Sequence, residues 1–84
     1  MDDDKKQYTG RVIFFNSGYG FIAWEIDGMP QNDLFVHWTD IKMEGYKTLY
    51  KNNLVLFSVG SNNQSRPKAI NVTLVPGQNN SSRP

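Results

Sequence analysis

Aromatic rings stand on alternate residues in two short segments of the chain, residues 18–22 and 34–38. Because successive side chains of a β-strand point to opposite faces of its sheet, each segment predicts a strand with two different faces. One face is aliphatic and suits a core; it carries Ile22, Leu34 and Val36. The other face carries flat rings, which are Tyr19, Phe21, Phe35 and His37. A sheet that presents rings to water is typical of proteins that stack planar ligands, and nucleobases are the commonest such ligands.

The chain contains five segments that predict strands and none that predicts a convincing helix. The predicted strands are residues 11–15, 19–26, 33–38, 54–59 and 69–74. The first two form a hairpin across Asn16-Ser17-Gly18, and Asp-Gly and Pro mark residues 27–32 as a loop. Residues 39–53 are a long polar connection with a helical turn near Thr39. This pattern predicts an all-β fold, a five-stranded antiparallel barrel, because closure removes exposed sheet edges.

Strict alternation is also expected in the last two strands. In the fourth strand it places Val55, Phe57 and Val59 on one face and Leu54, Leu56 and Ser58 on the other. In the fifth strand it places Ile70, Val72 and Leu74 inward, and Asn71 and Thr73 outward. These inward positions would complete the apolar core.

The 84-residue length predicts one domain near the lower size limit for an unaided core. There is no cysteine, so neither disulfides nor a zinc knuckle can supplement the packing. Polar ends predict disordered tails at residues 1–7 and 76–84 around a folded domain at 8–75. The sequence has no apolar run that could span a bilayer and no signal peptide, which predicts a soluble cytoplasmic protein without membrane contact.

The formal net charge is only +1. A large basic surface that captures phosphates by charge alone is therefore not expected. If the ligand is a nucleic acid, stacking has to contribute more of the affinity than counterion release does.

Several segments, in the right order, resemble the cold-shock domain, a nucleic-acid-binding barrel of the OB-fold group. Residues 10–16 resemble the first strand of this family, and the segments at 18–22 and 34–38 resemble its two ribonucleoprotein motifs. The resemblance runs from Gly10 to about Thr73. Further matches lie at residues 40–41, 45–49, 55–57 and 67–72.

The resemblance implies that the chain binds single-stranded RNA or DNA with low sequence selectivity, as an RNA chaperone or a regulator of transcription or translation. The nucleic-acid-binding residues that it implies are Phe14, Tyr19, Phe21, Phe35, His37, Trp38, Tyr46, Arg66 and Lys68. No cofactor is implied. A monomer is expected, although exposed Leu54 and Leu56 could join two copies weakly.

The chain departs from the family pattern at several of these positions. Phe14 stands where the family generally has tryptophan, and Ile13 and Ser17 stand where it generally has lysines, so two backbone charge contacts are not expected. The first turn is shorter than usual, and the loop at residues 23–33 is longer. Trp38 replaces the usual phenylalanine and enlarges the stacking surface.

The same residues allow other interpretations. A lone His37, with no cysteine and no second histidine, predicts neither a metal site nor a catalytic centre, so an enzyme is not expected. Either Phe14 or Phe15 faces the ligand, and the resemblance favours Phe14. Trp24 either extends the ring surface or caps the barrel. The alternative function is a protein-interaction module of the same fold, which would use Trp24, Leu54, Leu56 and the longer loop.

Overall fold

The computed structural model describes residues 6–61 and 66–76 of the chain. The strands in these ranges are β1 (Tyr8–Asn16), β2 (Tyr19–Ile26), β3 (Met29–Pro30), β4 (Leu34–His37), β5 (Leu54–Ser61) and β6 (Pro67–Leu74). A 3₁₀ helix, Trp38–Asp40, follows β4 directly, close to the predicted helical turn. The described residues contain no α-helix, and none of their helices has the length and hydropathy to traverse a bilayer.

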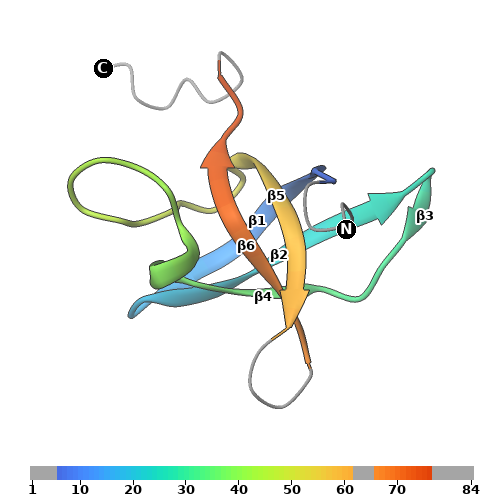
Figure 1. Ribbon diagram of the computed structural model, residues 1–84, viewed down its shortest axis with the longest axis horizontal. Coiled ribbons are helices and arrows are strands. Elements are labelled where there is room, and N and C mark those ends of the chain that lie inside the picture. Colours follow the sequence, from blue (N-terminus) through green and yellow to red (C-terminus); the bar gives the residue numbers. More distant parts are fainter. Residues whose placement is uncertain (1–5, 62–65, 77–84) are drawn as a thin grey trace.

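The strands close into a small barrel, in which β5 and β6 cross over the wall formed by β1, β2 and β4 (Figure 1). The strand order is β1-β5-β6-β4-β2, and β1 also pairs with β2, which completes the ring. The pairings are antiparallel except at the β4–β6 seam, where Phe35 and Lys68 pair in parallel. The predicted all-β barrel is confirmed.

A short strand lies where the sequence predicted only a loop. β3 pairs with the end of β2 through Glu25–Pro30 and Ile26–Met29. The Asp-Gly turn between the two strands has positive φ at both residues, 51° for Asp27 and 82° for Gly28. The β2–β3 hairpin extends beyond the barrel as an arm (Figure 1).

The core is apolar and mostly aliphatic. Its buried residues are Val12, Ile22, Leu34, Val36, Ile41, Leu49, Val55, Phe57, Ala69 and Val72. In β2 and β4 the predicted alternation is confirmed, because the aliphatic positions are buried while the ring positions face away from the core. The rings are therefore not needed to fill the interior.

Alternation fails in β5 and β6. The β5–β6 register shifts between Leu56 and Ser58, so that Ser58 is buried although it was expected on the outer face. In β6 the left-handed φ of 53° at Asn71 breaks the phase. The prediction that Ile70 and Leu74 point inward is wrong: Ile70 is half-buried and Leu74 is 39% exposed. Ala69 and Val72 are the buried residues of this strand.

The β1–β2 hairpin is held tightly by its glycines. Ser17 and Gly18 both have positive φ, 58° and 90°, as a two-residue type I′ turn requires. At Gly20 a Cβ atom would lie only 2.0 Å from the backbone oxygen of Phe14, so only glycine lets the two strands approach this closely.

Candidate nucleic-acid interface

The predicted ring residues gather on the outer face of β1, β2 and β4. Tyr19 pairs with His37 and Phe21 with Phe35 across the β2–β4 ladder. Phe14 pairs with Phe21 across the β1–β2 ladder, after a register shift that follows Val12. Directly paired residues of neighbouring strands point to the same face. The fold thus brings residues from three strands onto one surface.

Neighbouring rings on this surface are in contact range. The distances between ring centroids are 5.6 Å for Phe14–Phe21, 6.3 Å for Phe14–Tyr19, 5.8 Å for Phe21–Phe35, 6.0 Å for Tyr19–Phe35, 6.4 Å for Phe35–His37 and 5.8 Å for His37–Trp38. The rings at the margin are the most exposed: Phe14 41%, Tyr19 43% and Trp38 46%. Phe21, Phe35 and His37 are half-buried. We call these six side chains the aromatic platform.

The ring of His37 is held in one orientation by Thr39. Its Nδ1 accepts a hydrogen bond from the Thr39 backbone N–H at 3.3 Å and lies 2.8 Å from the Thr39 hydroxyl. This contact caps the 3₁₀ helix. Because Nδ1 serves as an acceptor, the neutral ring carries its proton on Nε2, which is then a donor for a ligand.

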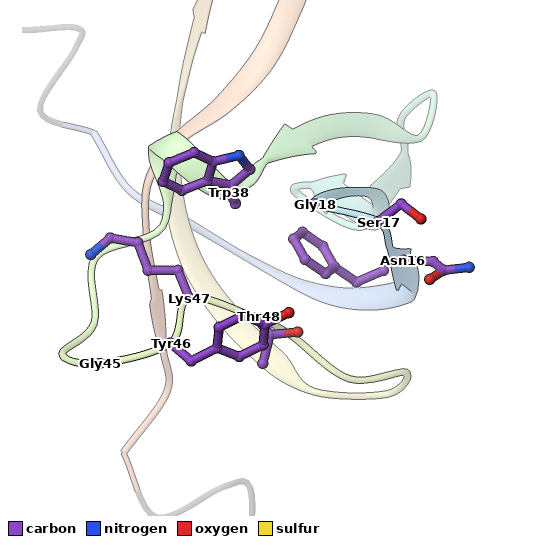
Figure 2. Close-up of a pocket in the computed structure, with 9 residues that line it drawn as sticks. Asn16, Ser17, Gly18, Trp38, Gly45, Tyr46, Lys47 and Thr48 are labelled. Atoms are coloured by element: carbon purple, nitrogen blue, oxygen red, sulfur yellow. The ribbon is translucent and has the colours of Figure 1, made fainter.

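A hollow of about 620 Å³ lies at one end of the aromatic platform. Figure 2 shows Trp38 and Tyr46 on opposite sides of it, with the turn of residues 16–18 along a third side. Trp38 is fixed against this turn: its backbone N–H donates to the Gly18 carbonyl at 2.8 Å. Tyr46, 86% exposed, stands on the long loop. The hollow is partly open to solvent.

The basic side chains near the aromatic platform differ in whether a neighbouring group already binds them. The Lys68 ammonium lies 3.0 Å from Oδ2 of Asp40. That oxygen is buried and accepts no well-aligned hydrogen bond, so the Lys68 charge compensates it. Arg66 is exposed just before β6. Lys47, on the rim of the hollow, donates to the Met43 carbonyl at 3.1 Å.

Two aromatic residues whose role the sequence left undecided are not members of the aromatic platform. Phe15 is half-buried and packs against the core, so Phe14 is the exposed member of that pair. Trp24 packs edge-on against Tyr8 and Phe57, with centroids 5.1 and 5.6 Å away. Its indole N–H donates to the Asn32 carbonyl at 2.9 Å. Trp24 therefore caps the barrel and does not extend the ring surface.

Two residues beside the predicted site were missed by the sequence argument, Thr39 and Asp40. Thr39 orients His37, and Asp40 engages Lys68. Asp40 and Lys68 are distant in the sequence, and only the parallel β4–β6 pairing brings them together. Among the residues that the structure describes, no three His, Cys, Asp or Glu side chains gather as a metal ion would require.

The fold and the site thus define a class of protein: small closed β-barrels that carry aromatic rings on one outer wall. The family model for the "'Cold-shock' DNA-binding domain" matches residues 8–75. The chain belongs to this nucleic-acid-binding family, as the resemblance in the sequence predicted.

Relatives of similar size support this assignment. The chain is 41% identical over 68 residues to a cold shock-like protein of Thermotoga maritima, covering 79% of this chain and 96% of that protein. It is 45% identical over 65 residues to cold shock protein CspB of Bacillus caldolyticus, covering 75% and 91%.

Longer proteins contain a similar unit. Cold shock protein 1 of Arabidopsis thaliana is 40% identical over 78 residues, which cover 90% of this chain but 25% of that protein. The solved structure of drosophila Unr CSD456 superposes with a TM-score of 0.66 at 25% identity, covering 87% of this chain and 28% of that one. The chain thus spans about a quarter of each of these longer proteins.

Proposed function

We propose that the chain binds single-stranded RNA or DNA by stacking successive bases on the aromatic platform. The observation that supports this most strongly is the contiguity of six rings on one wall of a barrel whose core is complete without them. Every base has a flat face, so such a surface binds unpaired strands with low sequence selectivity. In a duplex the base faces are already stacked and are not accessible to the rings.

The phosphates would face solvent in this arrangement. The net charge is +1, and Lys68 is already paired with Asp40, so the overall charge of the protein attracts phosphates only weakly. Stacking then supplies most of the affinity. A protein that holds unpaired strands in this way disfavours weak secondary structure, which is the action of an RNA chaperone or of a regulator of transcription or translation.

A titration tests this proposal. A pyrimidine-rich oligonucleotide is added to the protein, and binding is followed by quenching of tryptophan fluorescence and, independently, by anisotropy of a labelled strand. The variants Phe21→Ala and Phe35→Ala each remove one ring, and we expect each to weaken binding by about 1–3 kcal/mol. Equal affinity of both variants and the unaltered protein, or tighter binding of duplex than of single strand, contradicts the proposal.

The alternative function, a protein-interaction module, has less support from the structure. Trp24, which this alternative needs as an exposed contact, is engaged with Tyr8 and Phe57. Leu54 and Leu56 are half-buried rather than exposed. The titration also separates the two functions, because a module that binds only protein leaves the oligonucleotide unbound.

A further inference from the structure

Most of the exposed large apolar side chains in the described ranges belong to the aromatic platform or line the hollow beside it. The exceptions are Met29, which is 65% exposed, Tyr50, which is 66% exposed, and Leu74 on β6. Met29 lies on the arm, and Tyr50 lies near the end of the long loop, which runs from residue 41 to β5. The function proposed above assigns no role to either side chain.

We propose that Met29 and Tyr50 form a contact between copies of this chain. The arm of one copy binds the turn at residues 50–53 of the next copy when both are bound side by side on one single strand. The strand is then filled cooperatively. This inference rests on the proposed function.

The arm holds Met29 on a sheet face that continues beyond the core. Met29 pairs directly with Ile26, so the two side chains share one face. Alternation along β2 puts Ile26 on the same side as the buried Ile22, yet Ile26 is only half-buried. The backbone of the arm is fixed by Gln31, whose N–H donates to the Trp24 carbonyl at 3.0 Å and whose Nε2 donates to the Met29 carbonyl at 2.9 Å.

Tyr50 stands on a turn that is fixed to β1. Its backbone N–H donates to Oδ1 of Asn53 at 2.9 Å, and the Asn53 N–H donates to the Tyr50 carbonyl at 3.0 Å. The Asn52 N–H donates to the Val12 carbonyl at 2.8 Å. Both elements therefore have an ordered backbone before any contact forms, which lowers the entropic cost of association.

The charges beside the two apolar side chains are opposite in sign. Glu25 and Asp27 of the arm are exposed, and residues 25–33 contain no lysine or arginine. Lys51 is exposed and directly follows Tyr50. Within the described ranges none of these three charged groups forms an ion pair. A thioether of Met29 against the ring of Tyr50, with Lys51 beside Asp27 at the rim, is complementary in both polarity and charge.

The two surfaces lie apart on one molecule, so they meet between two copies. Figure 1 shows β3 at one end of the longest axis and the long loop towards the other end. The aromatic platform lies between them, because Trp38 is bound to the turn before β2 and the arm continues β2 where that strand ends.

The direction of the bound strand aligns the copies. A single strand has two different ends, so copies that bind it in the same way point in the same direction. The arm of one copy then faces the long loop of the next. This head-to-tail contact repeats along the strand.

The contact is too small to hold two free copies together. On a shared strand the effective concentration of the neighbour is about millimolar, so a weak contact becomes effective. We expect the second copy to bind about tenfold tighter than the first, after correction for the number of available positions.

The experiment uses oligothymidines of increasing length. Native mass spectrometry counts the copies on each strand and identifies the shortest strands that hold one copy and two. The populations with none, one and two copies give the ratio of the second affinity to the first. Met29→Ala and Tyr50→Ala should each remove the tenfold ratio and leave the affinity for the one-copy strand unchanged. Leu74→Ala is the matched control and should keep the ratio.

Charge reversal tests whether the arm and the turn contact each other. Asp27→Lys and Lys51→Asp each place like charges across the contact, so each should abolish the tenfold ratio. The double variant with both changes restores opposite charges and keeps the net charge of the chain. It should recover most of the ratio. Binding of the one-copy strand shows that each variant is folded.

The outcomes separate this inference from the proposed function. If the one-copy strand binds and Phe35→Ala weakens that binding, but the unaltered protein shows equal first and second affinities, the contact between copies alone is overturned. The same holds if Met29→Ala and Tyr50→Ala keep the full ratio, or if the double variant does not recover it. If no strand binds at all, both proposals are overturned.

Discussion

The β1–β2–β4 wall and the β5–β6 wall of the barrel enclose the same core but differ on their outer faces. On the first wall the outer positions Tyr19 and Phe21 of β2 carry rings. The outer positions Phe35 and His37 of β4 do so as well. The outer positions of the second wall carry no ring; they include Asn71, Thr73, Gly60 and the aliphatic Leu74. Both walls enclose the core, and the proposed stacking surface lies on the first wall.

Strands β2 and β4 of the first wall are more regular than the second wall, although β1 has its own register shift after Val12. Alternation in β2 and β4 continues without interruption, whereas β5 has a register shift and β6 a left-handed residue, Asn71. A β-bulge increases the bend and twist of a strand, and a small barrel needs such bends to close. The curvature is thus provided in part by the wall without rings. The rings on β2 and β4 therefore keep regular distances from their neighbours.

The largest effect on stability is expected from the shared core. Phe57 is fully buried and contacts Tyr8 and Trp24, so Phe57→Ala should lower the free energy of unfolding by about 3–5 kcal/mol. Leu74→Ala, on the outside of the β5–β6 wall, should cost about 0.5 kcal/mol or less. Chemical denaturation measures both. Similar losses for the two variants would show that the core assignment is wrong.

The next largest effect is expected in the long loop, where one substitution should weaken binding without changing stability. Tyr46 is 86% exposed and lines the hollow beside Trp38, whereas Tyr50 is 66% exposed and does not line it. Tyr46→Ala should weaken binding of a single strand by about 1–3 kcal/mol, with a change in unfolding free energy near zero. Tyr50→Ala is the matched control and should change neither quantity. Equal losses of affinity in the two variants would show that the hollow has no specific role in binding.

The regularity of the first wall explains why it could be predicted from sequence. In β4 each outward ring follows an inward aliphatic residue, and in β2 the outward Phe21 stands between the inward Gly20 and Ile22, so the period of two alone identifies the face. The opposite wall could not be predicted in this way. An extra residue in a strand shifts every later side chain to the other face, and nothing in Leu56, Phe57 or Asn71 indicates where the shift occurs.

Contacts between distant residues were also not predictable. The Lys68–Asp40 ion pair depends on the parallel seam between β4 and β6, for which the sequence holds no local signal. The role of Trp24 depends on the position of Phe57 across the barrel end. The small strand β3 is too short for any periodicity to identify.

A smaller effect is expected in the salt dependence of the binding affinity. This dependence tests whether the ring-bearing wall binds a strand mainly by stacking. Each phosphate that a cation neutralises contributes about 0.7 to the log–log slope for a single strand. With a net charge of +1 and Lys68 engaged, we expect about two or three such contacts, so that affinity falls only about tenfold from 50 to 200 mM salt. A slope that corresponds to about six contacts or more would assign most of the affinity to charge.

The smallest effect is expected at the seam where the two walls meet. Asp40→Asn removes the partner of Lys68, whose side chain is 24% exposed, and should lower the free energy of unfolding by about 1 kcal/mol or less. The released ammonium lies next to Phe35 in the β4–β6 register and becomes available to a bound strand. Affinity should then rise about threefold, with a log–log salt slope steeper by about 0.7. Glu44→Gln makes the same change in net charge on an exposed loop, away from any ion pair within the described residues. If both variants bind equally well, the gain reflects overall charge, and Asp40 does not restrain Lys68.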